Sequence, residues 1–199
     1  MIRSAVQGMV RSTLQTGRRA LGLPAPRRTE DRRVLEQVIL PAYAGRRAAQ
    51  RLLFVGCAAY TKSYGELFTA HEYWTIDPVP RRRRHGGARH IVDCLQNLGP
   101  YAPAEYFDVI VCNGVLGWGL DELADADAAF AACYRHLRAG GELLVGWNDV
   151  MPRNRVRPDS VPSLSGFQAR IFAPLQTATL AVRAANRHVF SFYAKPLSS

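Results

Sequence analysis

The sequence has few cysteines, almost no lysine and no long apolar run. Its apolar stretches all fall short of the roughly 18 residues that a membrane-spanning helix requires, which argues against an integral membrane protein. The cysteines show no paired CxxC spacing, so the sequence indicates neither a zinc site nor a disulfide framework. Because they lie singly in apolar stretches, we expect buried free thiols in a reducing compartment, and hence a cytoplasmic protein without a bound metal. The four are Cys57, Cys94, Cys112 and Cys133.

The positive charge comes almost entirely from arginine and is unevenly distributed. Lysine occurs only at Lys62 and Lys195, although the net charge is +10. Residues 1–51 hold 11 arginines against three acids, whereas the remaining 148 residues hold 15 basic and 13 acidic side chains and are nearly neutral. No basic stripe is interleaved with aromatic residues, so we predict no nucleic-acid partner. We attribute the preference for arginine over lysine mainly to the base composition of the genome.

Residues 1–23 contain no acid and place apolar residues on one helical stripe with arginines between them. This pattern predicts an amphipathic helix. Three interpretations stay open: a plain cap helix or partly disordered tail, a transit peptide, or a helix that lies on a membrane surface and gives the chain a peripheral membrane contact.

The segment that follows predicts a linker and then a second helix. Residues 24–28, PAPRR, are typical of a linker, and Thr29, Glu30 and Asp31 favour a helix start through an N-cap oxygen and the helix dipole. We therefore divide the chain into a basic N-terminal helical cap or extension, residues 1–45, and a main domain, residues 46–199.

The stretch from residue 51 to residue 77 organises that main domain. Apolar residues 52–55 are followed by Gly56, and the β-rich residues 73–76 are followed by Asp77, which predicts two buried parallel strands. The roughly 20 residues between Gly56 and Asp77 fit one crossover helix and place a carboxylate where a ribose would lie. A nucleoside-shaped ligand is the first hypothesis.

The remaining chain predicts an α/β fold. Acids at its start and arginines at its end mark one clear helix, and β-rich runs alternate with it before a closing hairpin. We expect a mostly parallel sheet with an antiparallel hairpin at the C-terminus. The helix is predicted at 121–138 and the strands at 90–92, 107–112, 142–147, 178–183 and 188–194.

Taken together, these motifs resemble the class I S-adenosylmethionine-dependent methyltransferases from about Arg46 to the C-terminus. The matching segments are FVGCAAY, Asp77, HIVDCLQNL, FDVIVCNGVLGWGL and LRAGGELLVGW. More narrowly, VGCAAYTKSY, NGVLGWGLDE and NRHVFSFYAKP are similar to a small bacterial subgroup of unassigned substrate. The first motif departs from the family pattern, because Phe54 stands where an acid is usual and Ala58 and Tyr60 replace two glycines.

The resemblance implies a Rossmann-like three-layer sandwich with a seven-stranded, mostly parallel sheet. It also implies S-adenosylmethionine as cofactor and transfer of its methyl group to a small molecule or biosynthetic intermediate. Since a sulfonium ligand has no phosphates to cradle, the missing glycines count against a dinucleotide more than against this methyl donor.

The resemblance and the chemistry of the side chains together predict the cofactor site. The Asp77 carboxylate can accept hydrogen bonds from both ribose hydroxyls, and Asp93 can accept one from an adenine amino group while the Cys94 N–H faces a ring nitrogen. Side chains after the glycine turn, with Lys62 and Tyr64 among them, could hold the methionine carboxylate. The predicted cofactor residues are Gly56, Cys57, Ala58, Tyr60, Thr61, Asp77, Pro78, Asp93, Cys94, Asn113 and Gly114.

Catalytic residues are predicted only from their place at the open end of the sheet. A general base is required only if the acceptor atom starts protonated. Asp149 is the candidate base, with Asn148 beside it as an orienter, and His90 or His85 as further candidates. Trp118 fits either a wall of the site or the core.

Two other functions and one assembly question stay open. The same fold and donor could serve another reaction, such as a cyclisation, or the chain could be a non-catalytic membrane-peripheral or partner-binding module. No large inserted lid is present, so the methyl acceptor is either bulky and partly exposed or is enclosed by a second subunit in a homodimer.

Overall fold

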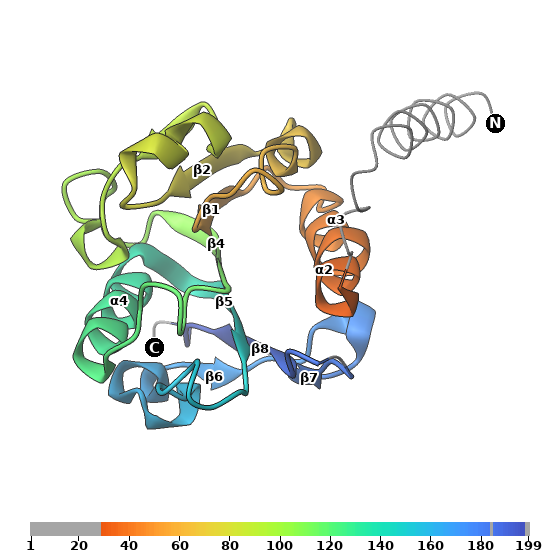
Figure 1. Ribbon diagram of the computed structural model, residues 1–199. Coiled ribbons are helices and arrows are strands. Elements are labelled where there is room, and N and C mark those ends of the chain that lie inside the picture. Colours follow the sequence, from red (N-terminus) through yellow and green to blue (C-terminus); the bar gives the residue numbers. More distant parts are fainter. Residues whose placement is uncertain (1–28, 184, 198–199) are drawn as a thin grey trace, which may run out of the picture.

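The computed structural model describes residues 29–183 and 185–197, and the amphipathic helix and linker predicted within residues 1–28 lie outside them. One mixed sheet separates two layers of helix (Figure 1). The strand order is β3-β2-β1-β4-β5-β8-β6, and β7 also pairs with β8. The predicted Rossmann-like three-layer α/β sandwich is confirmed.

Strands β1 to β5 run parallel, and β8 runs antiparallel to β5, β6 and β7. The predicted C-terminal hairpin corresponds to β7 and β8, while β6 and β7 are two short strands that pair with different parts of β8. The strands are β1 (Arg51–Val55), β2 (Glu72–Ile76), β3 (Arg89–Ile91), β4 (Phe107–Asn113), β5 (Leu137–Asn148), β6 (Gln168–Ala169), β7 (Thr179–Ala181) and β8 (His188–Ala194).

The N-terminal layer is one continuous run of helix that packs on the sheet. It comprises α2 (Glu30–Val34), a π-helical turn η1 (Leu35–Ile39) and α3 (Leu40–Ala44). Pro41 accounts for the π turn, because its ring clashes with the carbonyl four residues earlier and a widened turn relieves that clash. Thr29 stands at the N-cap as predicted, but its side chain makes no cap hydrogen bond with any described residue.

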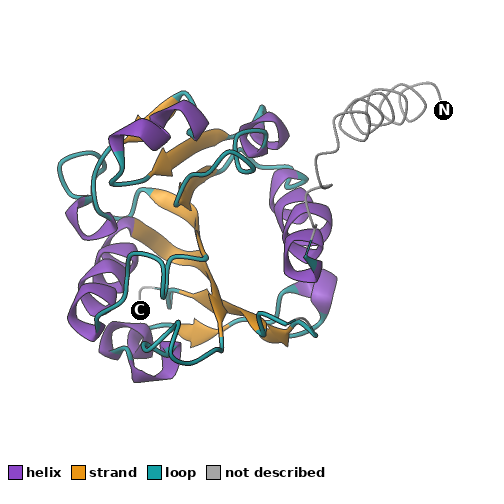
Figure 2. Cartoon of the chain, in the orientation of Figure 1, coloured by secondary structure: helices purple, strands orange, loops and turns teal. Residues whose placement is uncertain are grey.

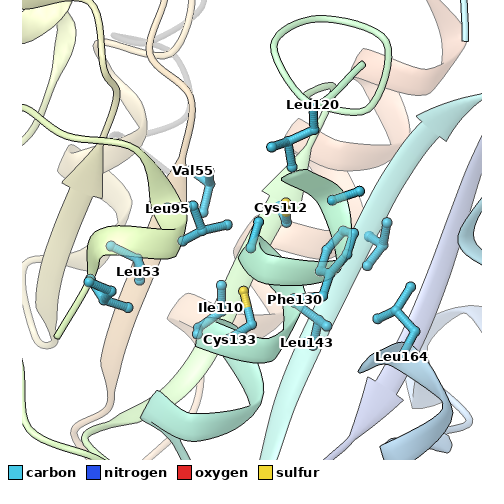
Figure 3. Packing of buried hydrophobic residues seen from close by; sticks show 14 of the residues in the cluster. Leu53, Val55, Leu95, Ile110, Cys112, Leu120, Phe130, Cys133, Leu143 and Leu164 are labelled. Carbon is cyan, nitrogen blue, oxygen red and sulfur yellow. The ribbon is translucent and has the colours of Figure 1, made fainter. Parts of the chain in front are cut away.

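On the opposite face, α4 (Leu123–His136) is the longest helix of the described chain. Its buried side packs against the strands. Figure 3 shows Phe130 and Cys133 packed beside Ile110 of β4 and Leu143 of β5. The helix ends two residues before the predicted end at 138. Residues 138–141 instead form an irregularity within β5, where Leu137 and Glu142 pair with residues only two apart in β4.

The predicted crossover helix between the first two strands is wrong. Residues 56–71 contain only a five-residue 3-10 helix, η2, as the cartoon in Figure 2 also shows. Glycine, serine and threonine in this segment are weak helix formers, and Tyr64 and Phe68 anchor it by packing against Phe54 and Tyr73. The other 3-10 helices are η3 (Pro80–His85), η4 (Leu95–Asn97), η5 (Pro158–Ser160), η6 (Pro162–Gly166) and η7 (Ala173–Leu175), and η2 spans Tyr64–Phe68.

The sheet therefore carries two hydrophobic cores, one on each face. Residues 35–43 of the N-terminal helix run close one core against β1, β4, β5 and β8, and α4 with η6 closes the other. The division predicted at residue 45 stays a prediction. In the structure, residues 30–44 contribute buried side chains to the same core as the strands that follow them.

Candidate active site

The carboxyl ends of the parallel strands form one edge of the sheet, and Asp77 lies between the ends of β1 and β2. Its Oδ2 accepts a hydrogen bond from the Cys57 N–H at 2.7 Å, and its Oδ1 accepts one from the Val79 N–H at 2.9 Å. The residue is only 1% exposed. The carboxylate thus joins the turn after β1 to the segment after β2, and it faces that turn.

A single arginine reaches the same carboxylate from η3. The Arg82 Nη1 lies 3.2 Å from the Asp77 Oδ2, and its side chain is 45% exposed. Arg82 thereby covers the buried Asp77 carboxylate from the solvent side. No local signal marks Arg82 among the four consecutive arginines, 81–84.

The turn after β1 brings its backbone close to this carboxylate. Gly56 has φ +85°, which favours glycine, and a Cβ there would lie 3.3 Å from Val115. Ala58 and Thr61 stabilise the turn internally, because the Thr61 hydroxyl donates to the Ala58 carbonyl at 2.9 Å and accepts from the Ala58 N–H at 3.0 Å. Burial and the nearby Asp77 charge raise the pKa of the Cys57 thiol to about 11.

The residues after the turn divide into surface and core. Tyr60 is exposed, and the Arg32 guanidinium from the N-terminal helix lies 3.9 Å from its ring centre. Lys62 is also exposed. Tyr64 is buried instead, and its hydroxyl donates to Glu36 at 2.9 Å, so it points away from the turn.

Asp93 and its neighbours form a separate polar group after β3. The Asp93 carboxylate accepts from the Asn97 side chain at 2.8 Å, the Cys94 N–H at 2.7 Å and the Tyr101 hydroxyl at 3.0 Å. The hydrogen bond from Asn97, followed by that from Cys94, lowers the pKa of Asp93. The Cys94 N–H, predicted to face a ring nitrogen, is here bonded to Asp93. Pro78, which directly follows Asp77 in the sequence, is exposed.

The ends of β4, β5 and β8 are joined through a histidine that sequence reasoning missed. His188 Nδ1 lies 2.7 Å from Asn148 Oδ1, and its Nε2 lies 3.1 Å from Asn113 Oδ1. Burial lowers the pKa of His188 to about 4 despite the opposing charge of Asp31. The imidazole is therefore neutral at pH 7. Gly114, exposed and with φ +72°, directs the chain away after Asn113.

Of the predicted catalytic residues, the structure brings Asn148 and Asp149 together but not His90. Both Asp149 oxygens are in ion pairs, at 2.8 Å from Arg157 and 2.8 Å from Arg187. His90 lies on β3, and β2, β1 and β4 separate it from β5. Four strand spacings amount to about 19 Å, so His90 and Asp149 belong to opposite halves of the edge.

His90 is packed against Thr75 of β2 and beside the turn after β1. Its Nδ1 lies 2.8 Å from the Thr75 hydroxyl and 4.0 Å from the Cys57 sulfur. Burial lowers its pKa. A Cβ at Gly86 would overlap the imidazole, so the glycine allows the histidine to lie there.

The loop after β4 presents Trp118 at the surface. This side chain is 59% exposed, and the Arg153 guanidinium stacks 3.3 Å from its ring centre. Leu116 from the same loop is buried in the core. Trp118 is therefore a surface residue near the end of β4, not a core residue.

Within residues 29–183 and 185–197, no group of three or more His, Cys, Asp or Glu side chains is arranged to hold a metal ion. All four cysteines are free.

The comparison with protein families identifies the same region. Residues 53–145, from β1 through most of β5, match a family described as a methyltransferase domain. No curated protein matches the sequence.

Three solved structures of similar fold are described as methyltransferases. The N-methyltransferase NodS from Bradyrhizobium japonicum WM9 is 19% identical over 84% of this chain and 96% of its own, with a TM-score of 0.61. A TehB-like SAM-dependent methyltransferase from Corynebacterium glutamicum is 16% identical over 96% and 99%, with a TM-score of 0.60. The Burkholderia thailandensis 1,6-didemethyltoxoflavin-N1-methyltransferase, with its substrate and S-adenosylhomocysteine bound, is 15% identical over 97% and 88%, with a TM-score of 0.56.

The part of the chain that the structure describes contains no helix with both the length and the apolar character needed to cross a membrane.

Proposed function

We propose that the chain, whose residues 53–145 match a methyltransferase domain family, is a class I S-adenosylmethionine-dependent methyltransferase and that it methylates a small molecule or biosynthetic intermediate at the carboxyl edge of its sheet. The observation that carries this proposal is Asp77, a buried carboxylate at the end of β2 that faces the glycine turn after β1. A nucleoside is recognised there by its ribose.

The hydrogen bonds of Asp77 fit a ribose once Arg82 moves. A carboxylate offers about four acceptor positions, and backbone N–H groups occupy one on each oxygen. Arg82 takes a third. Two ribose hydroxyls need two positions, so we propose that the Arg82 guanidinium yields its place when the cofactor binds.

We propose the other cofactor contacts by their place around this carboxylate. The Gly56–Thr61 turn lies on one side of Asp77 and Asp93 with Cys94 follows β3 on the other. Tyr60 and Arg32 cover the outer side of the turn, where a cationic guanidinium suits the methionine carboxylate. The methionine part then extends toward Asn113 and Gly114 at the end of β4.

When bound, S-adenosylmethionine supplies an activated methyl group on a sulfonium. The protein has to hold the acceptor atom in line with that methyl at about 3 to 3.5 Å, and orientation of this kind can supply several kcal/mol. We propose that Asn113, Asn148 and Asp149 border the acceptor, because they lie where β4 and β5 end. Asp149 can act as a base only after it leaves Arg157 and Arg187.

Two further proposals concern surroundings. We propose a cytoplasmic location because all four cysteines are free thiols. We also retain a homodimer and a peripheral membrane contact of residues 1–28 as hypotheses, which sedimentation and liposome binding of the full chain test directly.

Calorimetric titration with S-adenosylhomocysteine tests the main proposal. The wild-type chain should bind it, and Asp77→Ala should weaken binding at least about 100-fold, because both ribose hydroxyls lose their acceptor. Asp108→Ala is the matched control, since it removes an acid paired with an arginine at 2.6 Å near the opposite edge. Equal affinities of the three proteins, or no binding by the wild type, would contradict the proposal.

A further inference from the structure

His188 lies at the part of the carboxyl edge where β4 and β5 end, beside the proposed acceptor site. It contacts the last residue of each of these two strands. It opens β8, is 3% exposed, and has an asparagine side chain against each ring nitrogen. Asn148 is the last residue of β5 and Asn113 the last of β4. Three strands that are distant in sequence are thus connected by one imidazole.

The hydrogen bonds of this group fix the orientation of the two amides. A neutral imidazole donates from one nitrogen and accepts at the other, so it cannot donate to two carbonyl oxygens. Side-chain amide oxygen and nitrogen are assigned from such networks. The shorter contact, 2.7 Å to Asn148, is the one expected for N–H donating to oxygen, and the 3.1 Å contact then has the Asn113 NH₂ donating to Nε2.

Gly146 confines Asn113 to this arrangement. Residue 146 is paired with Asn113 across the ladder of β4 and β5, and a Cβ at this position would overlap the Asn113 side-chain amide. The same Cβ would lie 2.9 Å from His188 Nε2. The amide lies over the glycine with one end against the histidine, and when the NH₂ group is assigned to that end, the carbonyl oxygen points away from the ring.

We propose that His188 is a positioning residue for methyl transfer, which holds the Asn113 carbonyl oxygen toward the reaction centre to accept a hydrogen bond from the acceptor. The proposal rests on the function proposed above. It identifies the acceptor class as an amine or hydroxyl, because only a nucleophilic atom that carries an N–H or O–H can donate to this oxygen. A carbon nucleophile or a thioether offers no such donor.

The ring part of the proposal is tested without any ligand. Nitrogen-15 NMR of the full chain at pH 7 should show His188 protonated at Nδ1, with a scalar coupling between its Nε2 and the Asn113 side-chain amide. Protonation at Nε2 instead would reverse both asparagine amides and overturn the proposal.

The ligand part is tested with two cofactor analogues. Sinefungin carries a primary amine where the cofactor carries the methyl-bearing sulfonium, so its N–H groups stand in for a donor at the reaction centre, whereas S-adenosylhomocysteine has no such group. In His188→Leu we expect affinity for sinefungin to fall about tenfold or more, and affinity for S-adenosylhomocysteine to change less than about twofold.

Two further variants keep this test decisive. His136→Gln is the control, because it alters a buried histidine at the end of α4, near the opposite edge of the sheet, and should leave both affinities unchanged. If His188→Leu does not fold, His188→Gln supplies one donor and one acceptor and should retain part of the preference for sinefungin.

An unchanged ratio of the two affinities in the folded variants would overturn the role of His188. If the wild type binds neither analogue, the proposed function fails, and the contact of His188 with Asn113 is then decided by NMR alone.

Discussion

The two edges of the sheet differ in how completely their buried polar groups are paired. At the amino edge, charged side chains are paired with one another: Glu142 lies 2.8 Å from Arg46 and 3.1 Å from Arg170, and Asp108 lies 2.6 Å from Arg138. Near the carboxyl edge, some buried polar atoms have no partner. Eight buried side-chain atoms in the described residues lack a hydrogen-bond partner, and those of His85, Trp147 and Asn154 belong to residues at or after the ends of β2 and β5. The others belong to Asp31, His90, Gln96, His136 and Asn186.

This difference separates structure from function. Buried polar groups in folded proteins are nearly always hydrogen-bonded, so unpaired ones near a sheet edge are available to a ligand or to water. The ion pairs of the amino edge stabilise the fold. At the carboxyl edge Asp77 and Asp149 are paired with arginines as well, and we propose that these groups and the unpaired atoms beside them receive the ligand.

The largest expected effect is a loss of stability on mutation of the amino edge. Glu142→Ala removes a buried carboxylate and leaves Arg46 and Arg170 facing each other, so the free energy of unfolding should fall by about 3 kcal/mol. Urea denaturation measures the change. Affinity of the folded variant for S-adenosylhomocysteine should stay at the wild-type value, and a loss of binding without a loss of stability would abolish the distinction between the two edges.

Gly146→Ala tests the carboxyl edge itself. The added methyl group has to displace the Asn113 amide and crowds His188, and overpacking of this kind should cost about 2 kcal/mol of unfolding free energy. In the same variant the NMR coupling between His188 and Asn113 should disappear. Gly99→Ala is a suitable comparison, since a Cβ there meets no atom within 4 Å and it should be nearly neutral.

The pH dependence of stability should also originate at the carboxyl edge. The folded-state pKa of His188, about 4, lies below its ordinary value of 6.5. Between these two pH values the unfolded chain therefore binds a proton that the folded chain does not bind. The contribution of His188 to the free energy of unfolding is fully present above pH 6.5 and is lost as the pH falls toward 4. The loss amounts to about 2 kcal/mol at pH 5. His90, whose pKa is also lowered by burial, adds a change of the same sign.

Unfolding curves of the wild type and His188→Gln between pH 7 and 5 measure this contribution. The variant should lose less stability than the wild type over that interval. The charge of Asp31, which raises the pKa of His188, limits the effect. Parallel curves for the two proteins would show that His188 is not the group responsible.

The smallest expected effect concerns Arg82. Its ion pair with Asp77 is half open to solvent, and such pairs are worth up to about 1 kcal/mol. Because we propose that the guanidinium competes with the ribose, Arg82→Ala should raise affinity for S-adenosylhomocysteine by up to about fivefold in calorimetry. Weaker binding would mean that Arg82 contacts the ligand and does not compete with it.

The parallel half of the edge could be predicted from the sequence because its signals are local. Residues 52–55 and 73–76 are short apolar or β-rich runs, and each ends at a residue that breaks the strand. The sequence therefore predicts Gly56 directly after β1 and Asp77 directly after β2, as the structure shows. The crossover helix was wrong because spacing alone does not distinguish a helix from a 3-10 turn anchored by Tyr64 and Phe68. The exposed position of Trp118 likewise depends on how its loop packs.

The sequence by itself determined which segments form the main strands, the free cysteines and the acid at the end of β2, because each follows from residues within one element or one turn of the chain. Only the tertiary structure decided that His188 meets Asn113, 75 residues earlier, and that Asp77 is capped by Arg82 rather than by a neighbouring arginine. Such contacts depend on strand pairing across the sheet and on which side chain the fold leaves in reach, and no local pattern of residues encodes either.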